Sequence, residues 1–136
     1  MSAMPTARGK IIIAAGLNVW DHELRTAEAL ANVGYTVEFV PKSETDFQRT
    51  ADVLIDGIYW EMKAPKSSKI HMVEQNLRRA LRQSPNVVFD SRRMKGLPDS
   101  AIERELRKWS RELASLRRLL FVGRHSAVID IAPGAR

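Results

Sequence analysis

Two acidic residues and a lysine gather around one predicted hairpin. The dipeptide Asp56-Gly57 separates two short β-prone runs, and Asp-Gly in this place is the strongest short signal for a two-residue type I′ turn. Such a turn fixes the register, so that Asp52 faces Glu61 and Lys63 lies on the same side of the sheet. Opposed residues have β-carbons about 5 Å apart, where two carboxylates repel each other unless a cation intervenes.

This set of residues suits the hydrolysis of a phosphodiester. Carboxylate oxygens are the ligands that hard divalent cations prefer. A lysine on the same face can orient a water molecule or stabilise charge that develops on a phosphate. The alternative is that Asp52 merely begins a strand, while Glu61 and Lys63 are ordinary solvent-facing residues that form an ion pair at its rim. The residues alone leave both interpretations open.

A further acidic side chain comes from a helix predicted over about 22–33. Helical phase places Glu23 with Ala27 and Leu30 on the apolar side, where a charge is costly unless it is paired or binds a metal. Glu28 points to solvent. An acid in the first helical turn also interacts well with the helix dipole and can reach water. A catalytic and a purely local role for Glu23 therefore both remain open.

The order of the predicted elements indicates an α/β fold, a central mixed β-sheet flanked by helices. We expect strands at 10–15, 35–40, 52–55, 58–63, 86–91, 119–122 and 127–131, and helices at 22–33, at 69–83 and from a capping box of Ser100 and Glu103. The last helix continues an apolar stripe through Leu113 and Leu116. We predict a single domain over 1–136, a loop at 42–50, and disordered tails at 1–9 and 133–136. Trp20, Trp60 and Trp109 are expected in the core rather than as base-stacking platforms.

The charge is unevenly distributed along the 136 residues. The net charge is +6 and the pI is about 10.1, which favours polyanionic partners. From Lys63 to Arg124 the chain holds 16 Lys/Arg and 6 Asp/Glu, a balance of +10, and the remainder has a balance of −4. The acidic residues gather in the segment that ends at Glu61. An acidic spot beside a basic surface suits a metal site that faces a phosphate backbone. The alternative is that the cations are the solvated faces of helices.

Several other classes of protein are excluded or disfavoured. The sequence has no cysteine, which excludes disulfides and thiolate metal sites. It has no apolar run of the roughly 18 residues that would cross a membrane and no apolar stretch of a signal peptide at 1–10. It also lacks a phosphate-binding loop and a zinc-ligand cluster. His22, His71 and His125 are expected at the surface.

A longer set of motifs resembles a known family. The motifs are His22-Glu23-Leu24-Arg25-Thr26-Ala27, Gly34-Tyr35, Ala51-Asp52-Val53, Asp56-Gly57, Trp60-Glu61-Met62-Lys63-Ala64-Pro65, Asn86-Val87-Val88-Phe89-Asp90 and Arg92-Arg93. Together they resemble the tRNA-nuclease domain at the C-terminus of contact-dependent growth inhibition toxins, over about 22–109.

The resemblance implies a single restriction-endonuclease-like domain with the catalytic residues Glu23, Asp52, Glu61 and Lys63. Glu23, Asp52 and Glu61 would hold a divalent metal (Mg²⁺, Mn²⁺ or Zn²⁺), and Lys63 would assist the attacking water. It also implies cleavage of tRNA in the cytoplasm of a target cell, after delivery as part of a larger secreted toxin, and neutralisation by an immunity protein, which the basic segment predicts to be acidic. The alternative that this chain is a free-standing relative of such toxin domains stays open.

Other residues are candidates for contact with substrate. We predict that the nucleic-acid backbone is held by Lys66, Lys69, Arg79, Arg92 and Arg93. Asn76 and Gln83 could reach a phosphate, or could be a polar helix flank. Asp90 could line the cleft or pair with a neighbouring arginine. Two other functions stay open: a DNA endonuclease of the same fold, because nothing here reads a 2′-hydroxyl, and a non-catalytic nucleic-acid-binding module.

Overall fold

The computed structural model describes residues 7–41 and 51–131, apart from the side chains of Ala51 and Asp52. The predicted loop at 42–50 and most of the two predicted tails lie outside this part. The chain forms two compact units, an N-terminal unit (Met1–Tyr59) and a C-terminal unit (Trp60–Arg136). A single domain over 1–136 stays a prediction.

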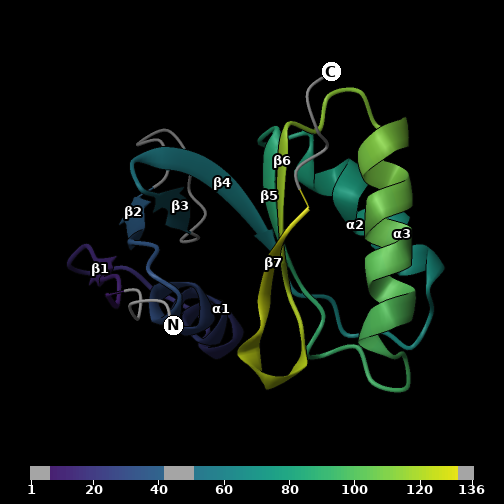
Figure 1. Cartoon of the computed structure of the whole chain (residues 1–136). Helices are drawn as coiled ribbons and strands as arrows, with labels where there is room; N and C mark the ends of the chain where they lie inside the picture. The colour runs from purple at the N-terminus through teal and green to yellow at the C-terminus, as the bar shows by residue number, and fades with distance from the viewer. Residues whose placement is uncertain (1–6, 42–50, 132–136) are drawn as a thin grey trace, which may run out of the picture. The chain divides into compact units, whose positions relative to one another are not determined.

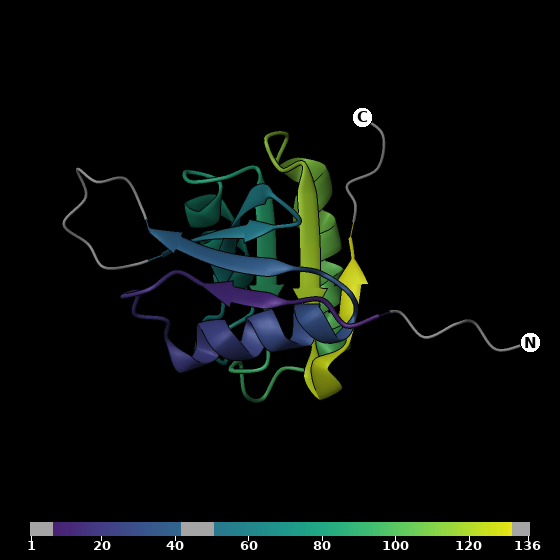
Figure 2. The same cartoon turned by 90° about the vertical axis from the view of Figure 1, so that its left-hand side faces the viewer.

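The N-terminal unit has a small mixed sheet and one helix. Its elements are β1 (Ile11–Ile13), α1 (Asp21–Asn32), β2 (Val37–Pro41), β3 (Ala51–Ile55) and the start of β4 (Ile58–Lys63). β1 is parallel to β2, and β2 is antiparallel to β3. Alternate residues of the sheet are buried, with Val37 opposite Ile55 and Phe39 opposite Val53. Helix α1, which buries Ala27 and Leu30, lies beside β1 (Figure 2).

The turn between β3 and β4 confirms the predicted hairpin connection. Asp56 and Gly57 both have positive φ angles, 49° and 83°, as a type I′ turn requires at its two central residues. The Asp56 side chain also accepts a hydrogen bond of 3.0 Å from the Thr36 backbone N–H. The turn is thus fixed both by its own backbone and by the loop before β2.

The C-terminal unit is a mixed sheet covered by two helices. Its elements are the rest of β4, α2 (His71–Ala80), β5 (Asn86–Asp90), α3 (Asp99–Glu112), β6 (Arg118–Val122), the 3₁₀ turn η1 (Arg124–Ser126) and β7 (Val128–Asp130). β4, β5 and β6 run parallel, and β7 is antiparallel to β6. Both helices lie on the same side of β5 and β6 (Figure 1).

The core of the C-terminal unit forms between the helices and one face of the strands. Leu77 of α2, Ile102 and Leu106 of α3, Phe89 of β5 and Phe121 of β6 belong to one buried cluster. The helices supply apolar residues three and four positions apart, and the strands supply every second residue. The predicted α/β class with mixed sheets and flanking helices is therefore confirmed.

Some predicted boundaries are wrong. Helix α3 begins at Asp99 after Pro98 and has no side-chain cap; Glu103, expected in a capping box with Ser100, pairs instead with Arg107 at 2.9 Å. The helix ends at Glu112, so that the buried Leu113 and Leu116 reach the core from the turn that follows it. Helix α2 spans His71–Ala80 and is shorter than the predicted helix at 69–83. Residues 81–83 form turns instead.

Within the predicted N-terminal tail, Gly9 is held by a backbone hydrogen bond of 2.8 Å to the carbonyl of Ala31. Across residues 7–41 and 51–131, none of the helices combines the length and the apolar character that a bilayer crossing demands.

Candidate functional site

Strand β4 presents Glu61 and Lys63 on one side. Lys63 Nζ lies 3.6 Å from Glu61 Oε2, and the two side chains are 25% and 21% exposed, respectively. Trp60, on the other side of the strand, is only 1% exposed. The predicted alternation of the strand is therefore confirmed, with an accessible acid–lysine pair on one face and an apolar anchor on the other.

The neighbouring strand sets the surroundings of this pair. Glu61 is opposite Val87 and Lys63 is opposite Phe89 in the parallel register of β4 and β5. Residues opposite each other point to the same side of a sheet, so the pair lies on the face where Phe89 joins the core beneath α2 and α3. The pair is thus held by a rigid strand at the margin of a packed layer.

The chemistry available to this pair follows from its exposure. A partly exposed ion pair adds only about 0–1 kcal/mol to stability. The lysine ammonium can donate hydrogen bonds to a phosphate oxygen or a water, and the carboxylate can accept a proton or bind a cation. An ordinary ion pair and a hydrolytic pair are both compatible with this geometry.

Asp52 lies in β3, with its backbone opposite Val40 of β2. Its side chain lies outside the described residues, so its opposition to Glu61 across the hairpin stays a prediction. The two-residue turn that would produce this opposition is in place, because Asp56 and Gly57 adopt the required conformation.

Glu23 has a local role at the start of α1. Its carboxylate Oε1 accepts a hydrogen bond of 3.0 Å from the backbone N–H of Trp20, which precedes the helix. Glu23 is half-buried and Glu28 is exposed, as their helical phase predicts. The first-turn interpretation of Glu23 thus has a contact that supports it, and the metal-binding role stays a prediction.

The donor set is chemically suited to a hard divalent cation, since each of its three proposed ligands offers carboxylate oxygens. Glu23 and Asp52 belong to the N-terminal unit and Glu61 to the C-terminal unit. No cluster of three or more potential metal-ligating residues occurs within the part of the chain that the structure describes. A shared metal site of Glu23, Asp52 and Glu61 therefore stays a prediction.

The predicted backbone-binding cations differ in their availability. Lys66, Lys69 and Arg79 are exposed, and Arg93 is half-buried. Arg92 instead makes an ion pair with the buried Asp90, from Arg92 Nη2 to Asp90 Oδ2 at 2.7 Å. Of the two roles considered for Asp90, the pairing with a neighbouring arginine is the one that the structure confirms.

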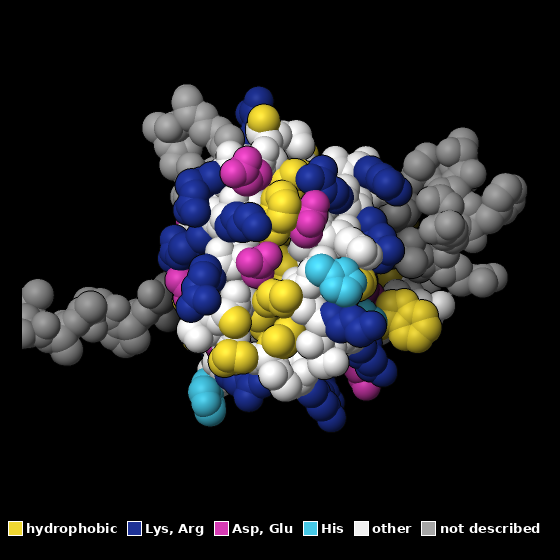
Figure 3. Space-filling model, turned by 90° about the vertical axis from the view of Figure 1, so that its right-hand side faces the viewer, with side chains coloured by type: hydrophobic (Ala, Val, Ile, Leu, Met, Phe, Trp, Pro, Cys, Tyr) yellow, Lys and Arg dark blue, Asp and Glu magenta, His cyan; other side chains and the backbone are white. Residues whose placement is uncertain are grey.

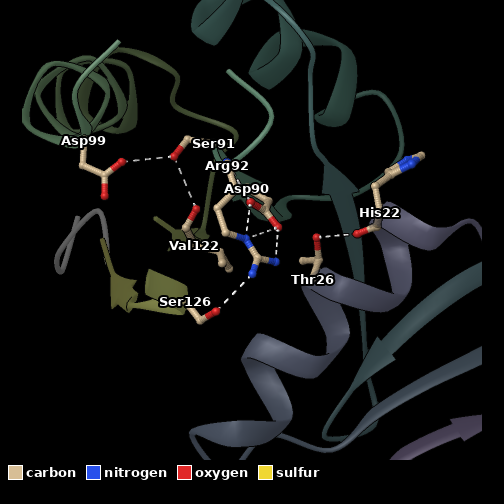
Figure 4. A network of polar contacts seen from close by, with 8 residues as sticks. All are labelled: His22, Thr26, Asp90, Ser91, Arg92, Asp99, Val122 and Ser126. Carbon is tan, nitrogen blue, oxygen red and sulfur yellow. Dashed lines mark hydrogen bonds and ion pairs between the residues drawn. The ribbon is translucent and has the colours of Figure 1, made fainter. Parts of the chain in front are cut away.

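The Asp90–Arg92 pair also holds the hairpin of β6 and β7. Arg92 Nε donates to Asp90 Oδ1 at 3.0 Å, and its Nη1 donates to the Ser126 hydroxyl at 3.1 Å (Figure 4). Ser126 and its neighbour His125 have positive φ angles of 59° and 60°, which are uncommon for residues other than glycine. Arg92 thus anchors a turn of unusual conformation, a role beyond its predicted contact with nucleic acid.

A second polar connection was not foreseen from the sequence. Asp99 Oδ2 accepts a hydrogen bond of 2.8 Å from the backbone N–H of Arg124, and Asp99 Oδ1 lies 3.5 Å from the Ser91 hydroxyl (Figure 4). Asp99 therefore ties the start of α3 to the loops after β5 and β6. Its position just after a proline was a signal only for a helix start.

The remaining polar and aromatic candidates differ in their exposure. Asn76 is buried, and its amide donates to the Met72 carbonyl at 2.8 Å, whereas Gln83 is exposed. His71 and His125 are exposed as predicted, and His22 is half-buried. The prediction for Trp60 is confirmed. The prediction for Trp20 is wrong, since 63% of it is exposed.

Exposed cations gather on the helical side of the C-terminal unit. Figure 3 shows Lys and Arg side chains spread over this face, with a few acids and a hydrophobic strip between them. Helix α3 contributes Arg104, Arg107, Lys108 and Arg111, all exposed. Trp109, half-buried, lies under Lys108 Nζ and Arg78 Cζ at 4.8 and 5.6 Å from its ring. The face is suited to a polyanion.

Comparison with known proteins identifies the class. The family model of the contact-dependent growth inhibition CdiA C-terminal domain matches residues 49–127. This match covers more than half of the chain and includes β3, β4 and the whole helical side. The chain therefore belongs to this family and is a toxin domain of the CdiA C-terminal type. A search of curated protein sequences finds no match.

A solved structure agrees with this assignment at the level of the fold. The chain is similar to a CdiA-CT/CdiI toxin and immunity complex from Burkholderia pseudomallei, with a TM-score of 0.63. The alignment covers 97% of this chain and 98% of that one, at 20% sequence identity. Because so few residues are shared, this likeness shows a common fold and does not identify a substrate.

Proposed function

We propose that this toxin domain is a metal-dependent endonuclease of restriction-endonuclease-like fold that hydrolyses RNA phosphodiester bonds, with tRNA as the substrate. The single observation that carries the proposal is the pair on β4, with Lys63 Nζ 3.6 Å from Glu61 Oε2 and both side chains partly exposed. Membership in the CdiA C-terminal family and the basic helical side add support.

Each proposed residue has one task. Glu23, Asp52 and Glu61 would hold the divalent cation, which would supply Lewis-acid stabilisation of the phosphate when bound. Lys63 would donate hydrogen bonds to the attacking water or to the phosphate oxygens, where negative charge grows in the transition state. Lys66, Lys69, Arg79 and Arg93 would neutralise the substrate backbone, and Arg92 would contribute through the hairpin that it anchors.

The proposal is tested by incubating total tRNA with the protein in Mg²⁺, Mn²⁺, Zn²⁺ or EDTA. Discrete fragments that require a metal and are lost in Glu61→Ala would support it. Glu103→Ala is the matched control, because Glu103 also forms a surface ion pair, with Arg107 at 2.9 Å on α3, and should cleave normally. Intact tRNA beside cut duplex DNA would replace RNA with DNA as the substrate. Survival of both would leave a non-catalytic binding module.

A partner is part of the same proposal. An acidic immunity protein would neutralise this toxin domain and would bind the basic C-terminal unit, which carries 17 Lys/Arg and 8 Asp/Glu. The similar solved structure is itself a toxin and immunity complex. Delivery into a target cell as part of a larger CdiA toxin follows from family membership. Harmless expression of the wild-type chain at high level, with no partner, would contradict this part of the proposal.

A further inference from the structure

The strongest unexplained feature of the N-terminal unit is an exposed tryptophan at the start of α1. Trp20 is 63% exposed, more than any other large hydrophobic side chain of the described residues. Full burial of a large apolar side chain stabilises a folded protein. Trp20 does not gain this in the isolated chain, so its surface is available for a contact with another molecule.

The ring of Trp20 belongs to a larger aromatic surface. The ring centroids of Trp20 and His22 are 6.5 Å apart, and the ring planes differ by only 20°. Parallel, offset rings at this separation are a favoured aromatic arrangement. The two rings therefore form a platform with a flat face, the shape that a planar ligand requires.

The backbone beneath this platform is fixed. The Trp20 N–H donates to the Glu23 carboxylate at 3.0 Å, and the Trp20 carbonyl accepts from the Leu24 N–H at 2.9 Å. On the next turn, the Thr26 hydroxyl donates to the carbonyl of His22 at 3.0 Å (Figure 4). A backbone that is already held in place adds no further ordering cost when a ligand binds.

The charges near the platform select the part of a nucleotide that it can take. Asp21 and Glu23 flank the ring in sequence, and helix α1 carries three acids (Asp21, Glu23 and Glu28) against the single cation Arg25. Such surroundings repel phosphate groups and leave the uncharged base as the favourable contact. Bases stack on Trp and His side chains where RNA is single-stranded or unstacked. A paired base inside a duplex would present no free face.

We infer that Trp20, with His22 beside it, is a base-stacking platform for an unpaired nucleotide of the RNA substrate. The inference rests on the proposed function for the identity of the ligand. Glu23, a proposed metal ligand, holds the Trp20 backbone directly, so the platform would place an unpaired base next to one of the proposed catalytic residues. Cleavage would then favour loops, bulges or single-stranded ends.

The test measures binding without cleavage. The full chain is titrated in EDTA with a fluorescein-labelled single-stranded oligouridine, and separately with a blunt RNA duplex, by fluorescence anisotropy. Trp20→Ala should weaken oligouridine binding by about 5- to 150-fold, the range for loss of one stacked base. Trp20→Phe should retain most of the affinity, and duplex binding should hardly change in either variant.

Matched controls separate stacking from general apolar contact and from damage to the fold. Ile12→Ala removes another exposed apolar side chain of the same unit and should bind oligouridine as the wild type does. Unlabelled oligouridine should quench tryptophan fluorescence in the wild type and in Trp109→Phe, and much less in Trp20→Phe. Circular dichroism checks that each variant is folded.

The outcomes distinguish this inference from the proposed function. Unchanged oligouridine affinity in folded Trp20→Ala, or no oligouridine binding by the wild type, would overturn the platform even if tRNA is cut. Loss of binding to an immunity protein alone, with RNA binding intact, would also overturn it. Trp20-dependent binding in a protein that cuts no nucleic acid would support the platform and refute the nuclease.

Discussion

The two units of the chain differ in what they expose to a partner. The N-terminal unit has 5 Lys/Arg and 8 Asp/Glu, whereas the C-terminal unit has 17 and 8, so that their balances are −3 and +9. The large hydrophobic side chains that are exposed among the described residues all belong to the N-terminal unit; they are Ile12, Ile13, Trp20, Val33 and Ile58. Positively charged side chains attract a partner over long distances, whereas exposed apolar side chains stabilise a complex only where they touch the partner.

This difference suggests a division of labour. The C-terminal unit would attract a polyanion and supply Glu61 and Lys63, and the N-terminal unit would supply short-range contacts together with Glu23 and Asp52. Electrostatic attraction raises the rate of encounter and weakens with salt, whereas stacking on an aromatic ring depends on the ligand having a free base. The two contributions can therefore be measured separately.

The largest expected effect on stability contrasts two tryptophans. Trp60→Ala should destabilise the protein by about 3–5 kcal/mol, because it removes a buried aromatic side chain and leaves a cavity. Trp20→Ala should change stability by no more than about 0.5 kcal/mol, because that ring is mostly in solvent. Urea unfolding followed by circular dichroism measures both. Equal losses for the two variants would contradict the contrast between a packed and an exposed ring.

The next effect separates chemistry from backbone binding in the C-terminal unit. Lys63→Ala should reduce the rate of tRNA cleavage by about 100- to 1000-fold, as expected when a group that stabilises the transition state is removed. Lys66→Ala removes an exposed lysine nearby in sequence and should cost only a few-fold. Single-turnover cleavage at saturating protein measures the two rates. A loss in Lys66→Ala as severe as in Lys63→Ala would contradict the role given to Lys63.

A smaller effect asks whether the two units unfold together. Gly57 in the N-terminal unit and Gly96 in the C-terminal unit have φ angles of 83° and 85°, with open space around each. Alanine at either position should cost about 1 kcal/mol from backbone strain alone. In calorimetry, one transition lowered by a few degrees in both variants would support a single domain. Two transitions, each lowered by one variant only, would contradict it.

The smallest effect compares cations from the two units. The double variant Arg79→Gln, Arg82→Gln should weaken tRNA binding in EDTA and flatten the dependence of log Kd on log salt by up to about 1 per lost phosphate contact. Arg8→Gln, Lys10→Gln removes two exposed cations of the N-terminal unit and should change the salt slope less. Equal slopes for the two double variants would show that the polyanion does not prefer the basic unit.

Much of the candidate site was predictable because it depends on local rules. The Asp56-Gly57 turn needs two residues that tolerate positive φ, and strand alternation then puts Glu61 and Lys63 on one side. The exposure of His71 and the burial of Trp60 follow from the same periodicities. The capping box of Ser100 and Glu103 placed the helix start two residues too late, because the helix begins at Asp99 and Pro98 rather than a polar cap precedes it.

Other features depend on partners that are distant in the chain. Two roles of Asp90 were open from the sequence, and the bond of Arg92 to Ser126, 34 residues away, could not be read from either segment. Leu113 and Leu116 fit a helical stripe but reach the core from a turn. Trp20 was predicted to lie in the core, since a tryptophan side chain is large and mostly apolar.

The sequence by itself determined the class of elements, the β3–β4 turn, the acid–lysine pair on β4 and the excess of cations in the second half of the chain. These follow from the backbone preferences of a few residues and from the periods of strands and helices. The tertiary structure decided that Arg92 is held by Asp90 and that Trp20 stays in solvent. The physical reason is that burial and pairing are settled by which distant surfaces meet, and local periodicity carries no information about them.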